Sequence, residues 1–232
     1  MNYELFIIFA NKNGNMMKRI VLAIACLALS LQLTEAQNTI ESIRKEYQDV
    51  HEWIGHMMPN DEGMTEMPPE YYDLNVVQNL PATGPHHENI RMFYGEVEND
   101  EESEDWTPYP DHWLRFVTAK YNFAAREFYE EYLYNDKGQV MFIYAITPDV
   151  GENVIPYELR LWFNGKKLLR FTAKKADLKE GEYIDNMATL KYKEVYSGTT
   201  IPELYEREAG RSQQRALRFL EMFKGIDKNT YL

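Results

Sequence analysis

Two short turns in the middle of the chain constrain its fold more than any other feature. Residues 135–138 (Asn-Asp-Lys-Gly) and 164–165 (Asn-Gly) are typical of tight turns, because glycine accepts a positive φ at no steric cost. Each turn stands between two runs rich in Val, Ile, Phe, Tyr and Trp, which favour strands. Such short connections force the flanking strands to be antiparallel neighbours. The middle of the chain is therefore predicted to be an antiparallel meander.

Six runs of the chain have a strand-like composition. They are residues 90–98, 112–123, 126–136, 138–147, 157–164 and 166–173. Turn residues separate them, so we predict a β-meander of five to six strands.

A helix is predicted on each side of this sheet in the sequence. The first covers residues 38–58, where Asn38 and Glu41 form a capping box and apolar residues follow at spacings of three and four. The second covers residues 200–223 and begins with a box of the same kind that includes a proline. The expected fold class is α+β, an antiparallel sheet flanked by an N-terminal and a C-terminal helix, in a single domain over residues 37–232.

Three stretches lack a regular pattern. Residues 59–90 are rich in Pro, Gly, Asn and Asp, which break regular structure, so we predict an irregular segment. The acidic run 96–106 is interpreted as a solvated loop. Residues 174–199 are interpreted as a loop followed by a strand or a turn.

The N-terminal stretch is predicted to be an export signal. Lys18 and Arg19 precede an apolar run over residues 20–33, which is shorter than the about 20 residues that cross a bilayer. Small and polar residues follow up to Ala36, as in a secretory signal peptide that is cleaved after Ala36. Residues 1–36 are therefore interpreted as an upstream extension and signal peptide. The mature chain is expected in the periplasm, at the cell surface or outside the cell.

Cys26, the only cysteine, suggests an alternative to simple cleavage. Bacterial lipoproteins are anchored through a cysteine, but here the apolar stretch continues past it to Leu33, so cleavage after Ala36 is favoured over lipidation. The exported chain then has no thiol for a disulfide, a nucleophile or a metal site. No later run is long enough to predict a transmembrane segment in the mature chain.

The charge of the chain restricts its partners. The formal net charge is −12 at pH 7, so phosphates repel the chain and nucleic acid is excluded as the expected partner. An anionic membrane surface is disfavoured for the same reason. The partners that remain are a glycan, a peptide or an envelope protein. The sequence indicates no cofactor and leaves the oligomeric state open.

The two hairpins resemble those of a known group of proteins. The segment "YLYNDKGQVMFIY" followed by "LRLWFNGKKLLRF", after an export signal that ends at Ala36 and Gln37, is similar to the paired tyrosine-rich β-hairpins of uncharacterised secreted proteins from Gram-negative gut bacteria. The resemblance implies a periplasmic or surface location. It implies no activity and assigns no functional residue.

Aromatic side chains on the predicted strands are the candidates for ligand binding. If Glu130, Tyr132 and Tyr134 share a face, aromatic and charged residues of the next two strands can extend it. An aromatic surface edged by charge binds sugars or peptides through stacking and forked hydrogen bonds. The alternative is that a helix covers these side chains and they are core. The candidate ligand-binding residues are Tyr132, Tyr134, Phe142, Tyr144, Arg160 and Trp162.

Three histidines are the candidate metal ligands. His86 and His87 are adjacent, and His112 is a possible third donor. Imidazole groups suit zinc, nickel or copper. Two adjacent histidines chelate one metal only where the backbone turns sharply, so the competing interpretation is a polar loop.

The sequence favours a secreted or periplasmic, non-catalytic binding protein that uses an aromatic sheet face. The alternative is a metal-assisted hydrolase or a metal-binding protein that uses the loop histidines, and a third possibility is a structural component of a surface assembly. These functions need different surfaces. A binder needs an uncovered aromatic face, an enzyme needs polar groups converging in a deep pocket, and an assembly component needs an exposed apolar patch. No catalytic residue is predicted.

Overall fold

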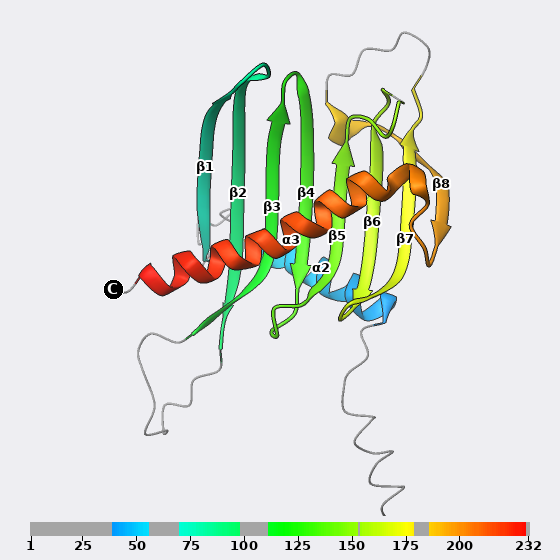
Figure 1. Cartoon of the computed structure of the whole chain (residues 1–232). Coiled ribbons are helices and arrows are strands. Elements are labelled where there is room, and N and C mark those ends of the chain that lie inside the picture. Colours follow the sequence, from blue (N-terminus) through cyan, green and yellow to red (C-terminus); the bar gives the residue numbers. More distant parts are fainter. Residues whose placement is uncertain (1–38, 56–69, 98–110, 153, 179–185, 231–232) are drawn as a thin grey trace, which may run out of the picture. The chain divides into compact units, whose positions relative to one another are not determined.

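The computed structural model describes residues 39–55, 70–97, 111–152, 154–178 and 186–230. The predicted signal peptide, Cys26 and most of the acidic run lie outside these residues. In the part that is described, one antiparallel sheet lies between two helices, so the predicted α+β class with an N-terminal and a C-terminal helix is confirmed (Figure 1).

The sheet has eight strands, which follow one another in chain order from one edge to the other. They are β1 (Tyr71–Leu80), β2 (Gly84–Glu96), β3 (His112–Phe123), β4 (Arg126–Tyr134), β5 (Val140–Thr147), β6 (Tyr157–Asn164), β7 (Lys167–Ala176) and β8 (Tyr192–Gly198). The helices are α2 (Ile40–Gly55) and α3 (Glu203–Thr230), with a short 3₁₀ turn, η1 (Met187–Thr189), before β8.

The predicted count of five to six strands was too low. The segment 59–90, predicted to be irregular, contains all of β1 and the start of β2. Leu74 and Val76 of β1 face the side of the sheet that α3 covers. Asp73 and Asn75, which alternate with them, are exposed on the other side. This alternation is that of a half-buried strand, and the turn-forming residues around it hide it in the sequence.

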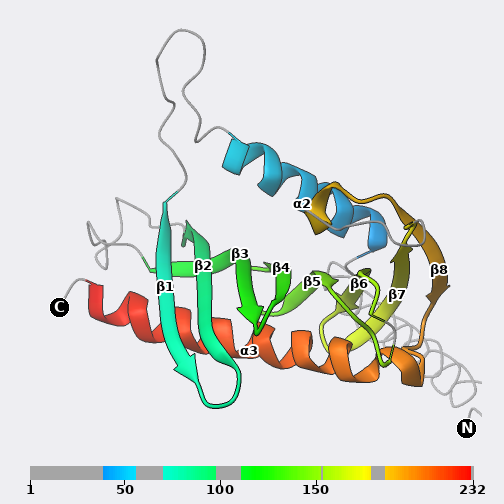
Figure 2. The same cartoon turned by 90° about the horizontal axis from the view of Figure 1, so that it is seen from above.

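The two helices lie on opposite faces of the sheet, as Figure 2 shows. Helix α3 crosses the sheet from β8 to β1 and covers the larger core, which includes Tyr132, Phe171 and Phe219. Helix α2 covers a smaller core that includes Ile43, Val50 and Phe116. We call the two faces the α3 side and the α2 side.

Helix α2 begins with a reciprocal cap that differs from the predicted one. The backbone N–H of Ser42 donates to Oγ1 of Thr39, and the backbone N–H of Thr39 donates to Oγ of Ser42. This exchange satisfies two backbone donors at the start of the helix, which is what a capping box does. Thr39 therefore replaces Asn38, which lies outside the described residues, as the capping residue.

Helix α2 covers only part of its side of the sheet. Its apolar residues contact Phe93, Phe116, Leu133, Phe142 and Trp162, which lie at one level across five neighbouring strands. Figure 1 shows α2 behind the lower part of the sheet. Among the described residues, α2 does not reach the upper part of the α2 side, where the strands carry polar side chains; the short η1 turn lies on this side of the sheet (Figure 2).

Candidate functional site

Strand register divides the six predicted ligand-binding residues between the two faces. Tyr132 lies opposite Ile143, whereas Phe142 lies opposite Leu133. Because cross-strand partners point to the same side of a sheet, Tyr132 and Phe142 point to opposite sides. The single aromatic face that would join Tyr132 and Tyr134 to Phe142 and Tyr144 is therefore wrong.

Tyr132 and Tyr134 are core residues beneath α3. Their exposed fractions are 0% and 1%. The hydroxyl of Tyr132 donates to Oε2 of Glu130 at 2.6 Å, and that of Tyr134 donates to the carbonyl of Ala216 in α3 at 2.8 Å. Both phenols are buried and already hydrogen-bonded, so they offer nothing to a ligand.

Phe142 and Trp162 are core residues beneath α2. They are cross-strand partners with ring centroids 5.2 Å apart, and both are almost fully buried. Tyr47 of α2 packs edge-on against Phe142, with 4.9 Å between the centroids. Their role is to attach α2 to the sheet.

Tyr144 and Arg160 lie on the same side as Phe142 and Trp162 but one step further along the strands. They are cross-strand partners, both half-buried, and the Arg160 guanidinium lies 5.4 Å from the centre of the Tyr144 ring. They belong to a row of polar and aromatic side chains across β4 to β7 that we call the polar band. The polar band consists of Tyr129, Glu131, Tyr144, Glu158, Arg160, Thr172 and Lys174.

Glu131 is the carboxylate at the β4 end of the polar band. It is 4% exposed and accepts hydrogen bonds from Tyr129 at 2.6 Å, from His51 at 3.3 Å and from Tyr47. Burial alone raises the pKa of Glu131, but these hydrogen bonds together bring it below the usual carboxyl value. The Glu131 carboxylate is therefore stabilised in its ionised form, and its hydrogen bonds connect α2 to the polar band.

Glu158 is the carboxylate at the other end of the polar band. Its Oε1 atom lies 2.8 Å from Nε of Arg160 and 3.0 Å from Nζ of Lys174, and its Oε2 atom accepts a hydrogen bond of 3.4 Å from Tyr144. Burial and the Glu158 carboxylate raise the pKa of Tyr144 and bring that of Tyr192 to about 12. Both phenols therefore keep their protons at neutral pH and serve as donors.

A shallow hollow continues the polar band toward β1. Its volume is about 470 Å³, and Lys120 on its floor is the cross-strand partner of Tyr129 in the polar band. Three asparagine amides are among the polar groups of its lining. The lining includes Asn75, Val77, His87, Asn89, Lys120, Asn122 and Glu127.

Part of the hollow is built by hydrogen bonds that fix its amides. Asn89 donates to Oδ1 of Asp73 at 2.6 Å and to Oδ1 of Asn75 at 3.0 Å. Asn122 accepts from the backbone N–H of His87 at 2.7 Å and donates to the carbonyl of Pro85 at 2.9 Å. The hollow and the polar band together form a polar strip across β1 to β7.

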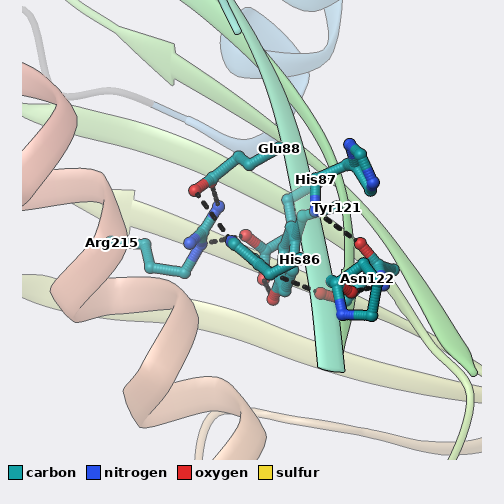
Figure 3. A network of polar contacts seen from close by, with 8 residues as sticks. His86, His87, Glu88, Tyr121, Asn122 and Arg215 are labelled. Atoms are coloured by element: carbon teal, nitrogen blue, oxygen red, sulfur yellow. Dashed lines mark hydrogen bonds and ion pairs between the residues drawn. The ribbon is translucent and has the colours of Figure 1, made fainter. Parts of the chain in front are cut away.

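The α3 side carries a different polar cluster, which Figure 3 shows in part. Arg215 of α3 donates to Oε2 of Glu130 at 2.6 Å and to Oε1 of Glu88 at 2.5 Å. Tyr121, Tyr132 and Ser212 also donate to Glu130. Because these groups satisfy one another, we interpret the cluster as an anchor for α3.

The three candidate metal ligands are not brought together. His86 points to the α3 side, where its Nδ1 lies 2.6 Å from the carbonyl oxygen of Asn122, and His87 points to the α2 side (Figure 3). His112 lies at the far end of β3 from Tyr121 and contacts Asp227 at 2.8 Å. Among the residues that the structure describes, no group of three metal-ligating side chains is present.

Most residues of the polar strip are not among those predicted from the sequence. Glu131, Tyr129, Thr172 and Lys174 are not among the predicted ligand-binding residues, although the alternation of a strand places Glu131 on the opposite face from Glu130. The same alternation, applied to every strand from β1 to β7 once the register is known, gives the whole strip.

In the described part of the chain, no helix is both long enough and apolar enough to cross a membrane. Comparisons with protein-family models, curated proteins and solved structures give no match to this chain.

Proposed function

We propose that the chain is an exported, non-catalytic glycan-binding protein, and that the glycan lies along the polar strip on the α2 side. The observation that carries this proposal is the mixture of groups in the strip. Carboxylates accept, Lys120, Lys174 and Arg160 donate, and the amides of the hollow do both. A sugar hydroxyl donates and accepts at once, so a surface that mixes the two roles suits it.

The shape of the strip favours a chain of sugars over a single small molecule. The hollow is shallow, and the polar band extends it from β4 to β7. Neighbouring strands lie about 4.8 Å apart, so the distance from β2 to β7 is about 24 Å. Tyr129 and Tyr144 are half-buried, with ring centroids 6.4 Å apart, and their exposed parts offer aromatic surface beside the polar groups.

The other two functions considered have less support. A metal-assisted hydrolase needs His86, His87 and His112 at one site, and they lie apart. An assembly component needs a contiguous apolar patch. The large apolar side chains exposed among the described residues are scattered over β1, β3, β8, α3 and the segments that follow β2 and precede β6. They are Val77, Val97, Phe123, Val154, Val195, Leu204 and Leu217.

Export is the second part of the proposal. It is supported by the charged, apolar and small-residue pattern of the N-terminal stretch up to Ala36. An exported protein meets the glycans of the cell envelope and its surroundings, which makes a glycan ligand accessible. N-terminal sequencing of the protein recovered outside the cytoplasm is expected to give Gln37 as the first residue, and a mature chain that begins near Met1 would refute export by this signal.

Calorimetric titration with soluble tetrasaccharides tests glycan binding. The ligands are a tetramer of glucose and a tetramer of N-acetylglucosamine, and the protein is the full chain. Lys120→Ala removes a donor from the hollow, where its side chain is 66% exposed and its ion pair with Glu127 contributes little to stability. We expect this variant to lose affinity by about tenfold.

Lys224→Ala is the matched control for this titration. It makes the same change on an exposed position of α3, on the other side of the sheet, and is expected to bind like the unmodified chain. No heat with either tetrasaccharide, or an equal loss of affinity in both variants, would contradict the proposed function.

A further inference from the structure

The β6–β7 end of the polar band holds three buried polar atoms that lack an aligned hydrogen-bond partner in the described residues. They are Oε1 of Glu158, Nε of Arg160 and Oγ1 of Thr172. The residues Thr172 and Glu158 are only 3% and 6% exposed. Buried polar groups are normally hydrogen-bonded, so three neighbouring atoms that make no aligned hydrogen bond indicate a place where another molecule supplies one.

Strand register places the three atoms side by side. Thr172 of β7 is the cross-strand partner of Arg160 of β6, and both point to the α2 side with Glu158. Nε of Arg160 lies 2.8 Å from Oε1 of Glu158, and Nζ of Lys174 lies 3.0 Å from the same oxygen, but neither contact is aligned as a hydrogen bond. Glu158 therefore attracts Arg160 and Lys174 through charge, but neither basic group donates an aligned hydrogen bond to Oε1 of Glu158.

The chemistry of these atoms specifies what group fits them. Glu158 offers an acceptor, and Arg160 and Thr172 each offer a donor. The complementary group has one N–H or O–H and an oxygen that accepts two hydrogen bonds. A secondary amide has this pattern, because its N–H donates and its carbonyl oxygen has two lone pairs.

We propose that the Glu158–Arg160–Thr172 cluster is a subsite for the N-acetyl group of an amino sugar, and this inference rests on the proposed glycan-binding function. The amide N–H donates to Oε1 of Glu158, and the carbonyl oxygen accepts from Arg160 and Thr172. The acetyl methyl group packs against the ring of Tyr144, which is half-buried beside the cluster.

One side chain of the cluster, Arg160, and its neighbour Lys174 are exposed enough to move and admit the amide. The side chains of Arg160 and Lys174 are 36% and 27% exposed. Long basic side chains have several rotatable bonds, so rotation of Lys174 opens the cluster without a change in the backbone. Glu158 and Thr172 are held by the strands and form the fixed part of the subsite.

The experiment compares two tetrasaccharides, of N-acetylglucosamine and of glucose, that differ in having or lacking the acetamido groups. Each is titrated into the full chain and into Thr172→Val, which keeps the shape of the side chain and removes its hydroxyl. Thr83→Val makes the same change at the β1–β2 turn and is the control. A soluble, N-acetylated and C-amidated pentapeptide of glycine and serine is titrated as a second source of secondary amides.

We expect the N-acetylglucosamine tetramer to bind at least about tenfold more tightly than the glucose tetramer. Thr172→Val is expected to abolish most of this difference, and Thr83→Val to preserve it. Thr172→Val is also expected to keep or raise the melting temperature of the free protein, because it removes a buried hydroxyl that has no partner. If Thr172→Val stays folded but no longer prefers the N-acetylglucosamine tetramer, Thr172 contributes to ligand binding and not only to the structure.

Three other outcomes would refute the subsite, the amino sugar or the proposed function. Equal affinity for both tetrasaccharides, unchanged in Thr172→Val, refutes the subsite and leaves glycan binding standing. Binding of the pentapeptide alone, weakened in Thr172→Val, refutes the amino sugar as the source of the amide. Absence of binding by both tetrasaccharides and the peptide refutes the proposed function and the subsite together.

Discussion

Nε of Arg215 in α3 lies 2.6 Å from Oε2 of Glu130 in β4, and the side chains of Arg215 and Glu130 are 15% and 1% exposed. Burial alone lowers the pKa of Arg215, but the nearby carboxylates and phenols raise it above its usual value, so Arg215 keeps its positive charge. The neighbouring Glu131 points to the other side of the sheet and contacts α2. Two adjacent acids therefore attach two different helices to one strand.

Arg215→Met is expected to lower the free energy of unfolding by about 3–5 kcal/mol, because it leaves the carboxylate of Glu130 buried without its cation. Urea denaturation measures this change. Arg218→Met, at an exposed position of the same helix, is the matched control and is expected to stay within about 0.5 kcal/mol of the unmodified chain. Equal effects of the two substitutions would show that the ion pair does not anchor α3.

Glu131 is expected to make stability depend on acid pH. Its pKa in the folded chain lies below the ordinary value of 4.5, so its contribution is fully present above that value and is lost as the pH falls through the folded pKa. Urea denaturation of the unmodified chain and of Glu131→Gln between pH 7 and pH 3 tests this. The unmodified chain should be more stable at pH 7, and the two curves should converge as the pH falls below about 4. A difference that stays constant over this range would contradict the assignment.

Trp162 and Tyr144, both singled out by sequence, are expected to respond differently to truncation. Trp162→Ala removes a buried ring beneath α2 and should cost about 3–5 kcal/mol of stability. Tyr144→Ala removes a half-buried ring and should cost about 1 kcal/mol while weakening glycan binding. Thermal unfolding and calorimetric titration of both variants separate the two roles. A severe loss of stability in Tyr144→Ala would place that residue in the core.

Ala124, in the turn between β3 and β4, is expected to be a point of backbone strain. Its φ is 54°, which lies in the left-handed region that disfavours alanine. Ala124→Gly should therefore raise the free energy of unfolding by about 0.5–1 kcal/mol. Ala125→Gly, at the next position and without a positive φ, should lower it because it only adds freedom to the unfolded chain. The opposite order of stability would contradict this reading of the turn.

The turns were the most predictable part of the fold. Gly138 and Gly165 have φ values of 70° and 56°, as expected for the two tight turns that indicated antiparallel hairpins. The edge strand β1 was missed because polar residues alternate along it and breakers flank it. Half of its residues face α3, and only the tertiary contacts show this.

The candidate site was predictable only in part. Alternation shows which side chains of one strand share a face, but the register between strands decides which faces of neighbouring strands match. Tyr144 and Arg160 share a face as expected, since β5 and β6 pair even-numbered residues with even-numbered ones. Between β4 and β5 the pairing joins even to odd numbers, so Tyr132 lies opposite Ile143. The register also shifts next to Tyr134, where two strands depart from regular pairing. A sequence does not specify such shifts, and each one moves side chains to the opposite face.

The most direct test of the central claim is to map the glycan on the protein by two-dimensional NMR of the backbone amides. The full chain is titrated with the N-acetylglucosamine tetramer, and amides whose signals shift are located on the fold. We predict that they cluster on the α2 side around Lys120, Tyr129, Tyr144 and Thr172, with little change along α3. Shifts confined to α3, or no shifts at millimolar glycan, would contradict the assignment of the polar strip as a glycan-binding surface.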